Sequence, residues 1–151
     1  MFAHMALTKY ALPHLQQTKG CIIYTVAPMY RQTTTGICPY ASANGGLWAY
    51  ARNAAFEEAK KGVRINMYMP GVTNTESFKE WTAGWTPQQL QEWIDLTNPL
   101  GKIAEPIDVA RVIAFMASQD NNYMIGAEVL NDGGQMLTNS FMINPKFPPK
   151  Q

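Results

Sequence analysis

The sequence predicts an α/β fold in which a short parallel sheet is flanked by helices. Three runs of β-forming apolar residues have the length of strands, at residues 21–26, 63–69 and 126–131. Segments with helical character separate these runs, so that strand and helix alternate along the chain. Parallel neighbours require such crossover connections, which are almost always right-handed. The alternation therefore predicts a parallel sheet with right-handed crossovers.

The first half of the chain is expected to form two helices and two strands. Apolar residues recur at helical spacing from residue 2 to 13, and Gly20 is expected to end this helix before the buried strand 21–26. A loop then leads through Gly36 and Pro39 into a long alanine-rich helix over about 40–61. Gly62 is a typical helix stop, and the strand 63–69 follows it.

The second half begins with a connection, residues 72–101, that we expect to form a mobile apolar flap. Within it, Thr86 is a typical N-cap and Pro87 suits the first turn of a helix. A further helix is expected over 107–118, before the strand 126–131. We expect one domain over residues 1–137 and an extended arm over 138–151, where prolines recur without periodicity.

Composition excludes several classes of function. The chain has 151 residues, 46% of them apolar, and a formal charge of +1 without a basic run, which argues against nucleic-acid or membrane-surface binding. No segment reads as a signal peptide or a membrane helix, so we expect a cytoplasmic protein. Cys21 and Cys38 lie in apolar segments and are expected to act as small hydrophobic residues. No spacing of histidines and carboxylates indicates a metal site.

Four segments, in order and spacing, resemble one known family. They are 12–23, which includes Leu-Pro-His-Leu and Gly-Cys-Ile-Ile; 40–44, Tyr-Ala-Ser-Ala-Asn; 63–75, which includes Val-Arg-Ile-Asn and Pro-Gly-Val-Thr-Asn-Thr; and 126–134. Over about residues 2–137 the chain resembles the second half of a short-chain dehydrogenase/reductase, a Rossmann-type oxidoreductase. The resemblance implies a three-layer, truncated half-Rossmann fold.

The family's pattern also includes a glycine-rich turn that binds the pyrophosphate of a dinucleotide. Here Gly45 and Gly46 lie within the predicted long helix, and Gly133 and Gly134 follow the last strand, so neither pair suits that turn. We therefore expect that this chain binds no cofactor.

The family's catalytic set is asparagine, serine, tyrosine and lysine, and only the tyrosine is matched, by Tyr40. The lysine position carries Asn44 and the serine position carries Ala27. Because no lysine lies one turn after it, Tyr40 is expected to stay a neutral hydrogen-bond or proton donor at pH 7. Thr25 points to the same side of its strand as residue 27 and is a substitute donor. The candidate catalytic residues are thus Tyr40, Thr25 and Asn44.

The candidate substrate-binding residues fall into three groups. Val72 and Thr75 match the family's loop that contacts the nicotinamide carboxamide, and we interpret them as a remnant of it or a structural turn. The aromatic residues of the 72–101 connection either cover an apolar ligand or fill a core or dimer interface. Arg31 either binds an anionic ligand or is solvated. The candidates are Arg31, Val72, Thr75, Phe78, Trp81 and Trp85.

A homodimer or higher oligomer is also expected. The strand 21–26 would form an apolar sheet edge, which needs cover to avoid aggregation. The resemblance implies a four-helix interface built from the helix before this strand and the helix after it, through apolar residues of 2–15 and 47–56.

Three hypotheses about function remain open. The first is a cofactor-independent, non-redox enzyme, a lyase, isomerase or cyclase, that acts on an apolar small molecule with Tyr40 as proton donor. The second is a non-catalytic binding or assembly subunit that pairs with a full-length relative. The third is a partial NAD(P)-dependent oxidoreductase. We rank the first of these highest.

Overall fold

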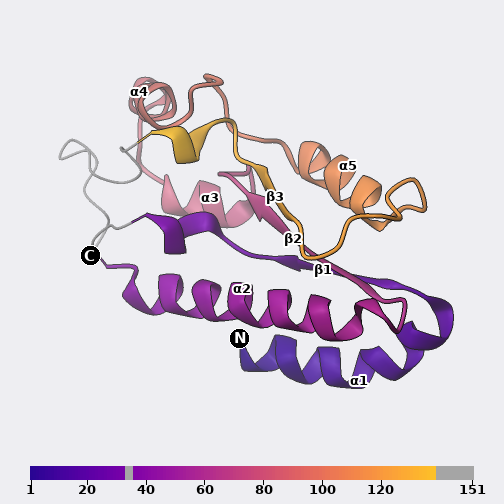
Figure 1. The fold of residues 1–151 in the computed structure, drawn as a ribbon. Helices are drawn as coiled ribbons and strands as arrows, with labels where there is room; N and C mark the ends of the chain where they lie inside the picture. Colours follow the sequence, from indigo (N-terminus) through magenta and orange to yellow (C-terminus); the bar gives the residue numbers. More distant parts are fainter. Residues whose placement is uncertain (33–35, 139–151) are drawn as a thin grey trace.

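The computed structural model describes residues 1–32 and 36–138, and it confirms the α/β fold (Figure 1). The strands are β1 (Cys21–Thr25), β2 (Arg64–Pro70) and β3 (Glu128–Asn131). The helices are α1 (Phe2–Thr18), α2 (Cys38–Ala59), α3 (Glu76–Trp81), α4 (Pro87–Thr97) and α5 (Pro106–Ala117), with short 3-10 helices η1 (Pro28–Arg31) and η2 (Gln135–Leu137). Helices α1 and α2 lie on one side of the sheet and α5 lies on the other, so the fold has three layers.

The sheet is parallel throughout, with the order β1-β2-β3. Cys21 pairs with Arg64 at one end of the β1–β2 ladder, and Met67 pairs with Glu128 at the start of the β2–β3 ladder. Among the described residues, β1 has a partner on one side only, so it forms the edge expected from the sequence.

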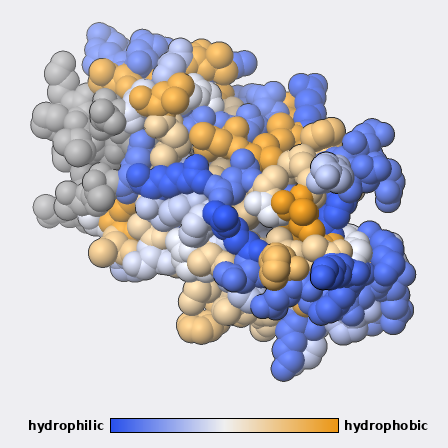
Figure 2. All heavy atoms as spheres, viewed as in Figure 1, coloured by the Kyte–Doolittle hydropathy of each residue, from blue (hydrophilic) through white to orange (hydrophobic). Residues whose placement is uncertain are grey.

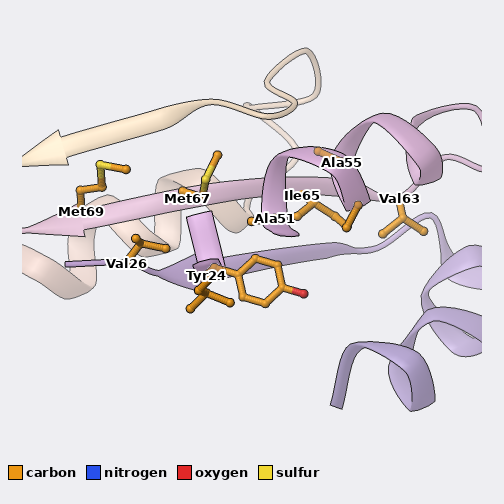
Figure 3. Close-up of a cluster of buried hydrophobic side chains, with 10 residues drawn as sticks. Tyr24, Val26, Ala51, Ala55, Val63, Ile65, Met67 and Met69 are labelled. Atoms are coloured by element: carbon orange, nitrogen blue, oxygen red, sulfur yellow. The ribbon is translucent and has the colours of Figure 1, made fainter. Parts of the chain in front are cut away.

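The main core lies between the sheet and α2 (Figure 3). Alternate residues of β2 point toward α2, because side chains on a strand alternate between its two faces. The helix contributes small side chains where it crosses the strands, which lets it approach the sheet closely. The residues labelled in this cluster are Tyr24, Val26, Ala51, Ala55, Val63, Ile65, Met67 and Met69.

Most predicted elements are present, and the ends of three helices differ from the prediction. The first helix ends at Thr18, and Lys19 rather than Gly20 takes the left-handed cap conformation, with φ 54°. The long helix already begins at Cys38, with Pro39 in its first turn. Helix α5 begins at Pro106 and ends at Ala117, one residue earlier at each end than expected.

The 72–101 connection is more regular than a flap. Thr86 caps α4 as predicted and forms a capping box with Gln89. A second helix, α3, was not predicted; the side chain of Thr75 caps it by accepting from the Phe78 N–H. Residues 139–151 of the predicted arm lie outside the described residues, so the division into a domain and an arm stays a prediction.

The two cysteines differ in their surroundings. Cys21 is half-buried, whereas Cys38 is exposed at the start of α2, and both thiols are free. The prediction that Cys38 acts as a small buried hydrophobic residue is therefore wrong, because the first turn of α2 faces solvent.

The surface combines apolar and hydrophilic regions, which Figure 2 shows as orange and blue patches on one face. Within residues 1–32 and 36–138, none of the helices has the length and apolarity that a membrane span requires. Groups of three or more potential metal ligands are likewise not found in this part of the chain.

A buried carboxylate joins α1 to α2. Glu58 of α2 accepts hydrogen bonds from Gln16 Nε2 of α1 at 2.6 Å and from Lys61 Nζ at 2.7 Å. The hydrogen bond from Lys61 is the main reason that the pKa of Glu58 is lowered. Because the folded pKa lies below the unfolded one, Glu58 stabilises the fold above its ordinary pKa of about 4.3, and this contribution is lost as the pH falls through the folded pKa.

We therefore expect Glu58→Gln to lower the free energy of unfolding by about 1 kcal/mol at pH 7, with a smaller difference from wild type at pH 3. Urea unfolding at both pH values measures this. Glu57→Gln is the control, because Glu57 is exposed on the same turn and should change neither value. A Glu58→Gln deficit of the same size at both pH values would show that the carboxylate charge is not responsible.

Candidate active site

A cavity of about 400 Å³ lies where the chain leaves β2. Ligands of open α/β folds bind at the carboxyl ends of the strands, so its position is the one expected for an active site. It is enclosed by η1, the start of α2, the segment after β2, and α3. The lining residues are Met29, Ile37, Tyr40, Val72, Thr73, Thr75, Ser77, Phe78 and Trp81.

Tyr40 is the residue of this cavity best suited to acid–base chemistry. It lies in the first turn of α2, and its side chain is 53% exposed. Its hydroxyl has no hydrogen-bond partner among the described residues, so it is available to a ligand in the cavity. A tyrosine so placed can donate a proton to a ligand oxygen and exchange it with solvent.

Asn44 lies one turn after Tyr40 and holds the start of α2 against the end of β1. Its Oδ1 accepts from the Ala27 N–H at 2.8 Å, and its Nδ2 donates to the Tyr40 carbonyl at 3.0 Å. The side chain therefore bonds to two backbone groups and is not among the residues that line the cavity. It can fix the backbone of Tyr40, but it carries no charge that would stabilise a phenolate.

Two other predicted site residues lie away from the cavity lining. Thr25 is exposed at the end of β1. Arg31 forms an ion pair with Glu128 of β3, and its guanidinium lies 5.5 Å from the ring centre of Tyr30. Arg31 therefore links η1 to β3. The sequence analysis considered only that it binds an anionic ligand or is solvated.

The aromatic residues of the connection form one cluster that combines the two roles considered for them. Phe78 and Trp81 line the cavity, whereas Trp93 is only 2% exposed and belongs to the core. The ring centre of Trp81 lies 5.1 Å from that of Trp85 and 5.4 Å from that of Trp93. Trp85 thus supports Trp81 from outside the cavity lining.

The structure brings together Tyr40, Val72, Thr75, Phe78 and Trp81 of the predicted residues. It adds four that sequence reasoning missed, namely Met29, Ile37, Thr73 and Ser77. Met29 and Ile37 flank the loop between β1 and α2, where no periodic pattern exists. Thr73 and Ser77 could have been found, because they alternate with Thr75 in the segment that was singled out.

The described residues fit one end of a nicotinamide dinucleotide. The Thr75 hydroxyl accepts from the Phe78 N–H at 3.3 Å, which leaves its proton free to donate to a carboxamide oxygen beside Val72. Neither glycine pair among the described residues opens a helix of sufficient length to bind a pyrophosphate: Gly45 and Gly46 lie inside α2, and Gly133 and Gly134 precede only the three-residue η2.

Comparison with known proteins identifies the family. The family model described as enoyl-(acyl carrier protein) reductase matches residues 1–136. The structure is similar to that of a short-chain dehydrogenase/reductase of unknown function from Caenorhabditis elegans with cofactor, with a TM-score of 0.78 and 29% identity, over 91% of this chain and 53% of that one. The chain belongs to the short-chain dehydrogenase/reductase family.

Several curated relatives of this family member are named as dehydrogenases. Meso-2,3-butanediol dehydrogenase of Serratia marcescens is 38% identical over 127 residues, which are 84% of this chain and 49% of the relative. L-Fucose dehydrogenase of Bos taurus is 32% identical over 133 residues, which are 87% of this chain and 48% of the relative. The chain thus spans about half the length of these relatives.

These names overturn the function ranked first from the sequence. The expectation of a cofactor-independent, non-redox lyase, isomerase or cyclase is wrong, because the relatives are dehydrogenases and a similar structure contains a cofactor. The error lay in the inference drawn from Ala27, Asn44 and the unmatched glycine-rich turn. These departures from the family's pattern were taken to mean that the chain catalyses a different reaction. A chain that spans half of its relatives does not need to hold every group of their sites.

Proposed function

We propose that this chain supplies the substrate pocket and the proton-transferring tyrosine of an NAD(P)-dependent oxidoreductase, which interconverts a carbonyl and a hydroxyl group on an apolar small molecule. The observation that carries the proposal is the placement of Tyr40 in one cavity with Val72 and Thr75, in a chain whose relatives are dehydrogenases. A bound reduced nicotinamide would supply a hydride to the carbonyl carbon.

The chain's own residues perform the remaining steps. The Tyr40 hydroxyl donates its proton to the carbonyl oxygen as that oxygen becomes an alkoxide, and the half-exposed side chain recovers a proton from water. Thr75 orients the carboxamide of the nicotinamide. Met29, Ile37 and the aromatic residues provide apolar surface that a bound substrate can cover.

In ketone reduction the Tyr40 hydroxyl donates a proton, and in alcohol oxidation the same oxygen has to accept one. Asn44 keeps the position one turn after Tyr40 uncharged, and we assign it the role of a positioning residue. We assign no catalytic or substrate-binding role to Thr25 and Arg31, and only a supporting one to Trp85.

The experiment is a reductase assay on the purified chain. NADH and NADPH are supplied at millimolar concentration, because the proposed contacts are to the nicotinamide end alone, and vicinal diketones serve as substrates. We expect consumption of reduced cofactor that depends on the diketone and matches the hydroxyketone formed. A rate no higher than that without protein, for both cofactors and all diketones, would refute the proposal.

We also propose that copies of the chain pair through α1 and α2, which lie side by side on one face of the sheet (Figure 1). Leu7 and Tyr10 of α1 and Phe56 of α2 are large apolar residues exposed in the single chain, at 70%, 73% and 86%. An interface would bury them.

Leu7→Glu should weaken that assembly by at least about tenfold in Kd, because burial of an unpaired carboxylate is costly. Sedimentation velocity over a range of concentrations measures the change. The control is Ile107→Glu, which places the same charge at a residue of α5 that is also exposed. Identical sedimentation of both variants and the wild type would contradict pairing through α1.

A further inference from the structure

The cavity beside Tyr40 has two kinds of lining. Hydroxyl-bearing side chains come from the segment between β2 and α3, at Thr73 and Thr75, and from α3, at Ser77. The remaining contacts, apart from Tyr40 itself, are apolar and come from η1, the residue before α2, the segment after β2 and α3: Met29, Ile37, Val72, Phe78 and Trp81. Charged side chains are not found among these described lining residues.

The hydroxyl groups of this lining have limited capacity for further hydrogen bonds. The Thr73 hydroxyl donates to the Gly71 carbonyl at 3.2 Å, and the Thr75 hydroxyl already accepts from the Phe78 N–H. Under the proposed function, Thr75 uses its remaining proton for the cofactor. The Ser77 hydroxyl makes no hydrogen bond among the described residues, so it remains available to a substrate. A substrate with more hydroxyl groups than Ser77 and Tyr40 can pair would bury some of them without partners, which is unfavourable.

The aromatic part of the lining is held rigidly. Trp81 lies 6.0 Å from Phe78 and 5.4 Å from Trp93, measured between ring centres, and the second pair meets edge to face. Trp93 is buried, so it fixes the cluster to the core. A flat ring of a ligand can then pack on Phe78 and Trp81 with little loss of side-chain freedom.

We propose that the substrate is a ketone whose carbonyl group is adjacent to an aromatic ring, and that Phe78 and Trp81 determine this preference. The inference rests on the proposed function and names its substrate class. It differs from what the names of several relatives suggest for those proteins, which are substrates without an aromatic ring: butanediol, fucose and diacetyl. The carbonyl oxygen meets Tyr40, while the ring packs on the apolar side of the cavity.

The test compares two vicinal diketones, 1-phenyl-1,2-propanedione and diacetyl. They differ in one substituent, which is a phenyl group in the first and a methyl group in the second. We expect kcat/KM with NADPH or NADH to be at least about 30-fold higher for the phenyl compound, since a pocket discriminates about 10-fold or more for each buried methylene. Trp81→Ala should reduce this ratio to about 3 or less. The control is Trp85→Ala, which removes a neighbouring indole that does not line the cavity, and it should keep most of the preference.

A binding measurement keeps this inference separate from the proposed function. Quenching of tryptophan fluorescence is titrated with each diketone in the absence of cofactor, and circular dichroism checks that each variant is folded. Phe78→Leu serves as a second variant if Trp81→Ala fails to fold. We expect at least about tenfold tighter binding of the phenyl compound in the wild type, with the difference lost in the variant.

The outcomes are distinguishable. If neither diketone is reduced but the phenyl compound binds more tightly, the proposed function fails and the assignment of the pocket stands. If both are reduced with equal kcat/KM, or diacetyl is preferred, the function stands and the substrate class is overturned. Equal binding of the two diketones, or a preference unchanged in the folded Trp81 or Phe78 variant, also overturns it.

Discussion

Tyr40→Phe should lower kcat for reduction of a diketone by about 100-fold and change KM little, because a positioned general acid contributes 10²- to 10⁴-fold. The hydroxyl is lost, but the ring and its place in the cavity are kept. The carbonyl oxygen would then have to take its proton from water, and the alkoxide would lose a hydrogen-bond donor in an apolar site.

Steady-state kinetics with both diketones measures this loss. The matched control is Tyr123→Phe, since Tyr123 is 97% exposed and does not line the cavity, and its kcat should equal that of the wild type. Fluorescence titration checks that binding of the diketone persists in Tyr40→Phe. Equal kcat for the two variants would remove Tyr40 from the reaction.

Asn44→Lys should raise the rate of alcohol oxidation at pH 7 by at least about tenfold. A cation about 4 Å from a phenolate contributes about 4 kcal/mol at an effective dielectric constant near 20, so the lysine would let Tyr40 act as a base. The same variant should lose about 1 kcal/mol of stability, because the Ala27 N–H loses its acceptor. Activity and stability would thus change in opposite directions.

Asn53→Lys is the control for added charge. Asn53 also lies on α2 and donates to a backbone carbonyl, that of Ala49, but it is remote in sequence from Tyr40 and outside the cavity. Oxidation of an aryl hydroxyketone with NAD⁺ or NADP⁺, together with urea unfolding, measures both effects. If Asn44→Lys and Asn53→Lys oxidise the alcohol at the same rate, a cation at position 44 does not assist proton transfer by Tyr40.

The fold was predictable where local signals are strong. The three strands contain short runs of β-forming residues, and Thr86 with Pro87 marks the start of α4 as the structure has it. Helix α3 was missed because it has only six residues and its cap, Thr75, was interpreted as part of a cofactor-loop remnant or a structural turn. Such a short helix depends on tertiary contacts, here those of Phe78 and Trp81 with Trp93.

The site was predictable only in part. Tyr40, Val72 and Thr75 were placed by resemblance, and the structure brings them together with Phe78 and Trp81. The partners of other residues could not be predicted from the sequence. The ion pair of Arg31 with Glu128, for example, depends on where β3 lies in the sheet.

Asn44 shows the same limit at a single position. The sequence shows that it replaces a lysine, but only the structure shows that it bonds to both Ala27 and Tyr40. Such long-range contacts have no local signature in the chain.

The most direct test of the redox function follows the hydride itself. NADH or NADPH with deuterium at both C4 positions is incubated with the chain and 1-phenyl-1,2-propanedione, and the hydroxyketone is analysed by mass spectrometry and NMR. We expect deuterium on the new carbinol carbon in the wild type and at least about 100-fold less product with Tyr40→Phe. A hydroxyketone without deuterium, or no hydroxyketone at all, would contradict hydride transfer to a ketone bound beside Tyr40.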